Sequence, residues 1–446
     1  MPKRGAAVGP QTKLAVENFP VSGLRFPRVF LEALGRIKAG CARVLDRDRK
    51  LDPSMARAIA AAAGEVADGR RDAEFPVDVF QTGSGTSTNM NANEVIARIA
   101  SRRLGRPVHP NDHVNLAQSS NDVMPSVLHV AALLALRRDL EPALGLLHAS
   151  LRKKSRRFDR IVKLGRTHLM DAVPIRLGQE FSGYAAQVAA GRDHVRRSAD
   201  SLRELALGGT AVGTGINAPP GFGRRVCALL ARDTGLPLRE ARNHFEAQGA
   251  RDGVVRLSGA LRALAGALVK IANDIRWMGS GPAGGLGELA LPALQPGSSI
   301  MPGKVNPVMC EVVVQVGAQV AGNDAAIAVA GQGGAFELNA MIPVMAHNLL
   351  QSIALLAAAS RIFASKCVDG LEADAARCRD LADRSLALAT ALAPRVGYDR
   401  AADLAKEAAR SRRSVKDLAI EKGWVTAAEA ERLFDPMRLT GPARTP

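Results

Sequence analysis

The feature that most constrains the fold is a long apolar repeat in the second half of the chain. Between Arg251 and Trp277, six aliphatic residues recur at spacings of 4, 3, 4, 3 and 4, namely Leu257, Leu261, Leu264, Leu268, Ile271 and Ile275. This spacing is typical of a helix packed in a bundle. Alanines occupy positions outside this seam, so more than one face can approach a neighbour closely. We therefore predict a helix that is buried between several others.

Four further segments have the same long apolar character. They run from Val123 to about Phe158, from Pro174 to about Leu205, from Pro307 to about Ala330 and from Ile342 to about Ser365. At a rise of 1.5 Å per residue, such helices are roughly 35 to 50 Å long. Aromatic residues make up only 4% of the chain, which favours packed helices over sheets. We predict a mainly α fold with a central bundle of five long helices.

Changes in composition divide the 446 residues into three predicted domains. Residues 1–119 are broken by Pro and Gly, carry one clear helical stretch at 56–67, and predict a mixed, mostly helical domain. Residues 120–370 contain the five long helices. Residues 371–446 are polar again and predict a small C-terminal helical domain, in which Thr426 and Glu429 have the spacing of a capping box.

The charge distribution argues against a nucleic-acid partner. A net charge of +17 would suit a polyanion, but Arg and Lys are scattered among acidic residues along the chain. Only short basic clusters such as Arg152–Arg157 occur, and no motif combines basic with aromatic residues. A positive field would also attract a small dicarboxylate and raise its encounter rate.

Cysteine use and the start of the chain predict a cytoplasmic protein. The five cysteines form no CxxC pair, so we expect neither a disulfide framework nor a zinc ribbon. The first twelve residues hold two basic side chains with no apolar stretch behind them. No later run of 18 residues reads as an uncharged apolar span, and we expect no membrane anchor.

Four polar segments interrupt the helices and are dense in hydroxyl, amide and charged side chains. They are Thr82–Asn93, His109–Asp122, Gly165–Asp171 and Gly297–Glu311. Hydroxyls, amides and backbone N–H groups donate hydrogen bonds to a carboxylate, and a lysine supplies countercharge. The segments therefore predict a site for a carboxylate ligand.

No metal or cofactor is expected in these segments. The eight histidines include no HExxH pair, and Pro110 with the turn-forming Asn111–Asp112 argues against a helix that would bring His109 and His113 together on zinc. The Gly-x-Gly at 83–85 lacks the strand and third glycine of a nucleotide-binding fingerprint, and it lacks the P-loop lysine.

In their order along the chain, the four segments resemble the class II fumarases of the fumarase/aspartase superfamily. GSSIMPGKVNP at 297–307 carries the superfamily signature, while HPNDHVN, QSSND and GRTHL narrow the resemblance to fumarases. The resemblance extends from GPQTKLAVENFP to YDRAADLAKEA. It implies reversible hydration of fumarate to L-malate in the citric acid cycle, without a cofactor. It also implies a three-domain subunit in a homotetramer with a core of about twenty helices, and active sites that are each shared by three subunits.

The resemblance also assigns catalytic roles to individual residues. Ser298 would take a proton from C3 of malate, and the backbone amides of its loop together with Lys304 would stabilise the alkoxide. Lys304 and Asn306 would stabilise the aci-carboxylate that follows. His168 would serve the leaving hydroxyl, and Glu311 would orient this histidine.

Two further sets of residues would bind anions. The substrate carboxylates would be held by Lys304 and Asn306 together with Ser84, Thr86, Ser119, Ser120, Asn121 and Thr167. A second anion site near the entrance would be formed by Arg106, His109, Asn111 and Asp112.

Structural alternatives exist for several of these residues. Ser298 and Ser299 could cap the following helix, and Glu311 could simply interact with the dipole of that helix. His168 could be a structural histidine, and Lys304 could be a solvated surface charge.

Two rival functions stay open at this stage. An aspartase of the same superfamily would release ammonia from aspartate with the same serine. Aspartases tend to have Ser-Thr-Asn-Asp where this chain has Ser119–Asp122, and Phe336–Asn339 also favours a fumarase. The second rival is a catalytically impaired structural homologue, against which the intact set of core residues argues.

Overall fold

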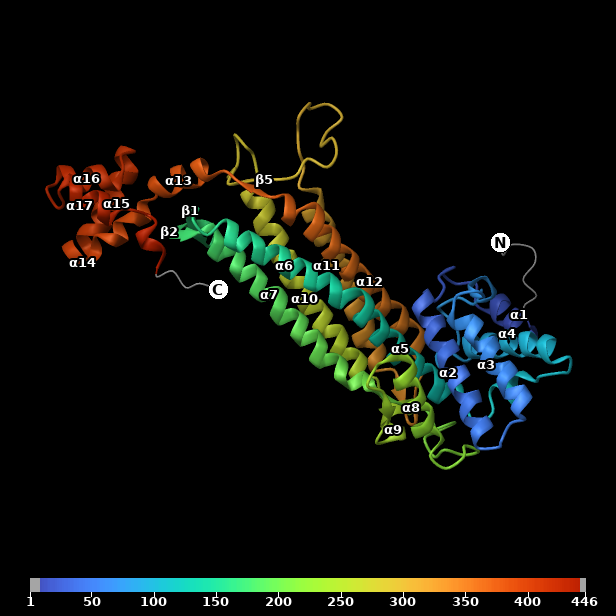
Figure 1. Ribbon diagram of the computed structural model, residues 1–446. Coiled ribbons are helices and arrows are strands. Elements are labelled where there is room, and N and C mark those ends of the chain that lie inside the picture. The colour runs from blue at the N-terminus through green and yellow to red at the C-terminus, as the bar shows by residue number, and fades with distance from the viewer. Residues whose placement is uncertain (1–8, 442–446) are drawn as a thin grey trace. The chain divides into compact units, whose positions relative to one another are not determined.

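A computed structural model describes residues 9–441 of the chain (Figure 1). It divides into two compact units, each of which is described by itself. Unit 1 comprises Met1–Pro142, Arg192–Ala265 and Val316–Ala358, and unit 2 comprises Ala143–Gly191, Gly266–Gln315 and Ala359–Pro446. Residues 1–8 and 442–446, at the ends of the predicted first and third domains, lie outside the described residues. The three-domain boundaries stay a prediction.

The predicted long helices are confirmed, and the fold is mainly α-helical. They are α5 (Ser120–Ala135) continuing through the π-helical turn η3 (Leu136–Leu140) into α6 (Glu141–Arg157), then α7 (Leu177–Ala199), α10 (Asp252–Met278), α11 (Val308–Gly331) and α12 (Ile342–Lys366). All six seam residues of α10 are at most 2% exposed. The segment from Pro174 begins differently from its prediction, because residues up to Arg176 form a strand and the helix begins at Leu177.

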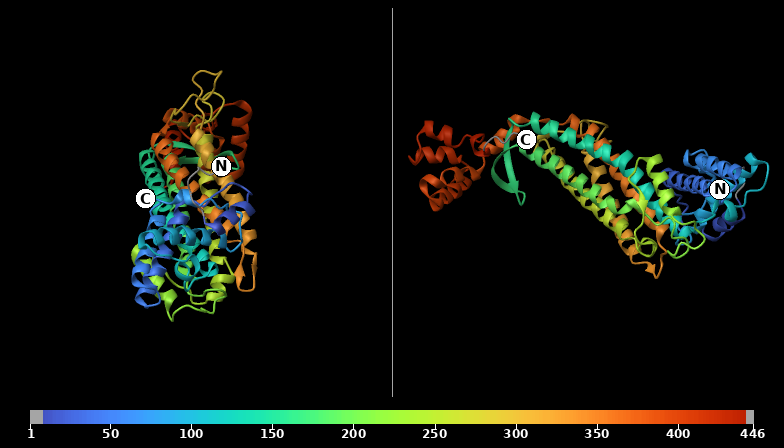
Figure 2. Two further views of the ribbon diagram at one scale, coloured as in Figure 1. Left: turned by 90° about the vertical axis from the view of Figure 1, so that its right-hand side faces the viewer. Right: turned by 60° about the horizontal axis from the view of Figure 1, so that its bottom comes forward.

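Polar side chains join consecutive long helices in pairs. The pairs are Glu141–Arg192 between α6 and α7, Tyr184–Asp274 between α7 and α10, Ser258–Asp324 between α10 and α11, and Asn323–Ser352 between α11 and α12. Each pair lies within one unit. In the last three pairs, hydroxyl and amide groups are thus satisfied by partners on the neighbouring helix instead of by solvent. Figure 2 shows the same helices from two further sides.

Unit 1 also contains shorter elements. They are α1 (Pro10–Asn18), α2 (Arg28–Arg47), α3 (Pro53–Ala67), η1 (Asp72–Glu74), α4 (Thr86–Leu104), η2 (Pro110–Val114), η4 (Asp200–Arg203), α8 (Phe222–Thr234), α9 (His244–Gly249), the parallel pair β3 (Glu204–Leu205) and β4 (Arg239–Glu240), and the antiparallel pair β6 (Gly334–Ala335) and β7 (Leu338–Asn339). The helix predicted at 56–67 is confirmed as part of α3.

The expectation of no helix after His109 is wrong. Pro110 occupies the first position of the π-helical turn η2, where its missing N–H costs nothing. The His109 ring caps the turn, since Nδ1 accepts a hydrogen bond from the Asp112 N–H at 3.1 Å.

Unit 2 contains an antiparallel hairpin and the C-terminal helices. Its further elements are β1 (Val162–Thr167), β2 (Met170–Arg176), β5 (Leu289–Ala290) paired with β8 (Glu372–Ala373), η5 (Val368–Gly370), α13 (Ala375–Asp383), η6 (Leu386–Ala391), α14 (Ala393–Val396), α15 (Tyr398–Ser411), α16 (Val415–Glu421), α17 (Ala427–Leu433) and η7 (Arg438–Thr440). The capping box predicted for Thr426 and Glu429 is confirmed at the start of α17. Buried apolar side chains between Leu388 and Phe434, such as Leu404 and Leu418, form one hydrophobic cluster.

The sequence predicted no segment long and apolar enough to span a membrane, but two helical spans meet that description. By length and composition alone, Val308–Gly331 and Ile342–Gly370 are apolar enough to cross a membrane. The most apolar stretch of the second is 61% buried, as in the core helix of a globular protein, and that of the first is 28% buried. Both spans also carry polar groups that pair with each other, such as Asn323 with Ser352.

Candidate functional site

In unit 1, hydroxyl and amide side chains gather where α4 and α5 begin. The Asn89 Nδ2 of α4 donates to the Ser120 Oγ of α5 at 3.2 Å. A Cβ on Gly85, the residue that precedes α4, would lie 3.0 Å from the Met124 side chain of α5. The first turns of the two helices are therefore neighbours. Free N–H groups and the helix dipole make such ends suitable for binding carboxylates.

Two glycines shape the approach to α4. Gly85 has a positive φ of 78°, and a Cβ on Gly83 would lie 1.8 Å from the Ala340 carbonyl oxygen. The positive φ favours glycine at position 85, and the close approach of the Ala340 carbonyl leaves no room for a side chain at position 83. Ser84 lies between these two glycines and Thr86 follows the second, and their hydroxyl oxygens are 2.7 Å apart.

The start of α5 is held by Asp122, which is fully buried. One carboxylate oxygen accepts the Ser119 N–H at 2.9 Å and completes a capping box. The other accepts the N–H groups of Gly208 and Thr210 at 3.1 and 3.0 Å. Burial raises the pKa of Asp122 to about 6, and the three N–H donors act in the opposite direction. Ser119 thus has a structural role as well as its proposed one.

The neighbouring Asn121 is also fixed, because its Nδ2 donates to the Ala211 carbonyl at 2.8 Å. One amide hydrogen and the side-chain oxygen stay available for a ligand. The segment 119–122 is therefore preorganised against the loop at 208–211.

Sequence reasoning missed Lys38, which lies fully buried in α2. Its Nζ donates to the side-chain oxygens of Asn115 and Gln118 at 2.9 and 3.0 Å, directly before Ser119. Burial lowers its pKa to about 8. The signal was present in the sequence, since Leu34, Lys38 and Cys41 occupy successive positions of one apolar helix face.

The predicted second anion site is only partly assembled. His109 Nδ1 lies 3.1 Å from the Asp112 carboxylate, and Asn111 between them is exposed. Arg106 instead pairs with Asp52, which caps α3, at 2.6 Å. Within residues 9–441, no hydrogen bond or ion pair joins Arg106 to the other three residues, so this site stays a prediction.

In unit 2, the loop at 297–307 is folded around the hydroxyl of Ser298. The Ser298 Oγ accepts hydrogen bonds from the backbone N–H groups of Ile300 and Met301 at 3.2 and 3.0 Å. Two donors that point at one oxygen favour its ionised form. The alternative role of Ser298 as a helix cap is wrong, because the donors belong to its own loop and α11 begins at Val308.

The ends of this loop are fastened together. The Gly297 N–H donates to the Lys304 carbonyl at 2.9 Å, and the Asn306 Nδ2 donates to the Gly297 carbonyl at 2.7 Å. Asn306 thus closes the loop and keeps one amide hydrogen for a ligand. The Lys304 side chain is exposed, and in the described part of the chain it has no acidic partner. Glu311 lies in the first turn of α11, as its structural alternative requires.

Thr167 and His168 lie at the tip of the β1–β2 hairpin. His168 and Leu169 form its two-residue turn, with positive φ values of 56° and 61°. Tight hairpin turns require this conformation but favour Asn and Gly, so the tip is strained. His168 and Thr167 are exposed. No hydrogen bond joins His168 to Glu311 among the described residues, and that pairing stays a prediction.

The four predicted segments are thus distributed over both units. Ser84, Thr86 and Ser119–Asn121 lie together in unit 1, whereas Thr167, His168 and the 297–311 segment belong to unit 2. Between residues 9 and 441, no cluster of three or more His, Cys, Asp or Glu side chains is arranged to hold a metal ion.

Most of the chain matches models of known protein families. Residues 4–322 match the lyase family, and residues 388–441 match the fumarase C C-terminus. The class II fumarate hydratase of Mycobacterium tuberculosis is 56% identical over 416 residues, which cover 93% of this chain and 88% of that protein. The class II fumarate hydratase of Corynebacterium glutamicum is 54% identical over 435 residues, 96% of this chain and 92% of that protein.

Solved structures agree with the sequence relatives. A crystal structure of recombinant class II fumarase from Schistosoma mansoni superposes with a TM-score of 0.96 at 36% identity, over 99% of this chain and 97% of that one. A crystal structure of fumarate lyase:delta crystallin from Brucella melitensis bound to cobalt gives a TM-score of 0.94 at 45% identity, with the same coverage.

Proposed function

We propose, because this chain belongs to the class II fumarate hydratases, that it catalyses the reversible hydration of fumarate to L-malate. It would therefore act as a carbon–oxygen lyase of the citric acid cycle. The observation that carries the proposal is the Ser298 hydroxyl, which two backbone N–H groups hold in a loop that also carries Lys304. This arrangement suits a serine that must ionise.

The proposed reaction in the direction of dehydration begins at C3 of malate. The Ser298 alkoxide removes the C3 proton, and the electron pair moves onto the adjacent carboxylate, which becomes an aci-carboxylate. Lys304 and Asn306 stabilise this second negative charge, so their interactions strengthen in the transition state. The C2–OH bond then breaks on the opposite face, His168 delivers a proton to the hydroxyl, and water and fumarate result. Glu311 orients His168 in this scheme.

The substrate carboxylates bind to short polar side chains and helix ends. Ser84, Thr86 and the Ser119–Asn121 segment supply hydroxyl and amide groups beside the starts of α4 and α5, and Thr167 adds a hydroxyl from the hairpin. The ligand class is thus a small dicarboxylate. Arg106, His109, Asn111 and Asp112 would form a second anion site near the entrance.

The absorbance of fumarate tests this function and separates it from that of an aspartase. Purified protein is mixed with L-malate or L-aspartate, and fumarate formation is followed in both. We expect turnover of L-malate and none of L-aspartate. Turnover of L-aspartate alone would assign the chain to the aspartases, and inactivity with both would indicate an impaired homologue.

We also propose that the protein is a cytoplasmic homotetramer whose active sites are each shared by three subunits. The support is α11, whose most apolar stretch is only 28% buried in the single chain. Its exposed positions include Ala318, Ala321, Ala325 and Ala328, which permit close packing of another helix. Light scattering is expected to give about four times the chain mass of 47.0 kDa. A monomer that turns over malate would contradict the shared site.

A further inference from the structure

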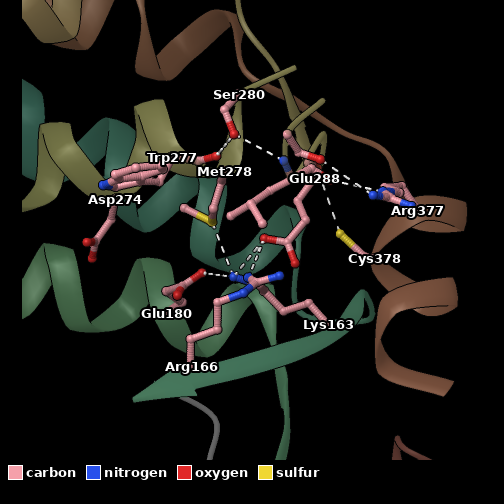
Figure 3. Close-up of polar contacts among 12 residues, drawn as sticks. Lys163, Arg166, Glu180, Asp274, Trp277, Met278, Ser280, Glu288, Arg377 and Cys378 are labelled. Carbon is pink, nitrogen blue, oxygen red and sulfur yellow. Dashed lines mark hydrogen bonds and ion pairs between the residues drawn. The ribbon is translucent and has the colours of Figure 1, made fainter. Parts of the chain in front are cut away.

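A buried cluster of charges lies at the base of the hairpin that carries His168 (Figure 3). Glu288 is fully buried, and one of its oxygens lies 2.9 Å from Arg166 Nη1 and 3.2 Å from Lys163 Nζ. Lys163 is 2% exposed and also contacts Glu180 at 2.7 Å. The function proposed above assigns no role to any of these four residues.

The hairpin is built so that two of its cations reach one carboxylate. Side chains three residues apart on a regular strand point to opposite faces. The register of β1 against β2 shifts between Leu164 and Arg166, and this irregularity interrupts the alternation. The shift brings Gly165 so close to β2 that a Cβ would lie 2.6 Å from the Val173 carbonyl oxygen. Lys163 and Arg166 can therefore both bind Glu288.

The backbone of Glu288 is itself anchored on both sides. Its N–H donates to the Met278 carbonyl at the end of α10 at 2.8 Å, and its carbonyl accepts the Asp374 N–H at 3.0 Å. The next two residues form β5, which pairs with β8. The carboxylate is thus a fixed point to which the more exposed hairpin is attached.

The hairpin tip needs such an attachment. Arg166 is two residues from His168, whose positive φ persists only if the surroundings impose it. Arg166 and His168 also line one cavity of about 640 Å³, so packing leaves open space beside the tip. The ion pair from Arg166 to Glu288 therefore restrains the hairpin close to its tip.

We propose that Glu288 is a positioning residue, which fixes the hairpin through Arg166 and Lys163 and so holds His168 in its catalytic place. This inference rests on the proposed function, in which His168 acts on the leaving hydroxyl. A buried pair of this kind costs desolvation free energy, and its value here lies in fixing one geometry.

The test replaces Glu288 by glutamine, which keeps the shape and one acceptor but removes the charge. We expect kcat for malate to fall by about 10²-fold with KM changed less than about threefold, because misplacement of a catalytic group by about 1 Å has that effect. Hydrogen exchange of residues 162–176 should accelerate while the rest of the chain is unchanged. Arg166→Met should do the same, and the double variant should be no worse than either single one.

The matched control is Glu372→Gln, which removes an exposed ion pair with Arg157 in the same unit. It should keep the wild-type kcat and the wild-type rate of hydrogen exchange in residues 162–176. Wild-type kinetics in Glu288→Gln, or faster exchange throughout the chain, would overturn the positioning role. If Glu288→Gln does not fold, Arg166→Met decides by the same criteria. If the wild type has no fumarase activity, hairpin exchange still decides the attachment, so the two proposals fail separately.

Discussion

Replacing Ser298 by alanine is expected to lower kcat for malate dehydration by about 10³-fold, within the range for loss of a general base. The change removes the oxygen that the Ile300 and Met301 N–H groups hold, and these donors then face water. The loop is exposed, so the free energy of unfolding should change little. Initial rates of fumarate formation measure the effect, and the thermal midpoint of unfolding shows that the fold is intact.

Ser299→Ala is the matched control for this prediction. Ser299 is the adjacent residue and is exposed, so its replacement makes the same chemical change in the same loop. It should keep a kcat within about twofold of wild type, which is less than about 0.5 kcal/mol in the barrier, because Ser298 keeps its hydroxyl and both N–H donors. A Ser298→Ala variant that is as active as Ser299→Ala would remove Ser298 from the role of base.

Replacing His168 by asparagine is expected to lower kcat for malate dehydration by about 10²-fold, because the group that protonates the leaving hydroxyl is lost. Asparagine tolerates the positive φ of 56° at this position, so the turn should persist. The loss would therefore reflect the missing proton donor. The measurement is kcat from initial rates of fumarate formation at saturating malate.

The control for His168 is His194→Asn, at an exposed position of α7. It should retain the wild-type kcat. If His168→Asn keeps the wild-type kcat, the histidine does not serve the leaving hydroxyl.

The long helices could be predicted because their apolar spacing is regular. The seam of α10 is buried at every predicted position, and α11 and α12 begin within one residue of the prediction. Boundaries were less predictable where a tertiary contact overrides local preference. Pro174–Arg176 continues the hairpin since β1 pairs with it, and Pro110 starts a π-helical turn since the His109 ring caps it.

The candidate site could be read only as separate segments. GRTHL and GSSIMPGKVNP indicate chemistry, but the sequence does not reveal that the N–H groups of Ile300 and Met301 both donate to Ser298. Lys38 and Glu288 were missed because their importance comes from burial beside distant partners. Glu288 is separated from Arg166 by 122 residues, so no local pattern connects them.

The stereochemistry of hydration tests the central claim most directly. Fumarate is incubated with the wild-type protein in D₂O, and the malate formed is examined by proton NMR. Addition of a deuteron at C3 by Ser298 and of hydroxide at C2 from the opposite face predicts one L-malate, with a single deuterium at one C3 position. Malate labelled equally at both C3 positions would contradict proton delivery from one face by Ser298, and no malate at all would contradict the proposed fumarate hydratase activity.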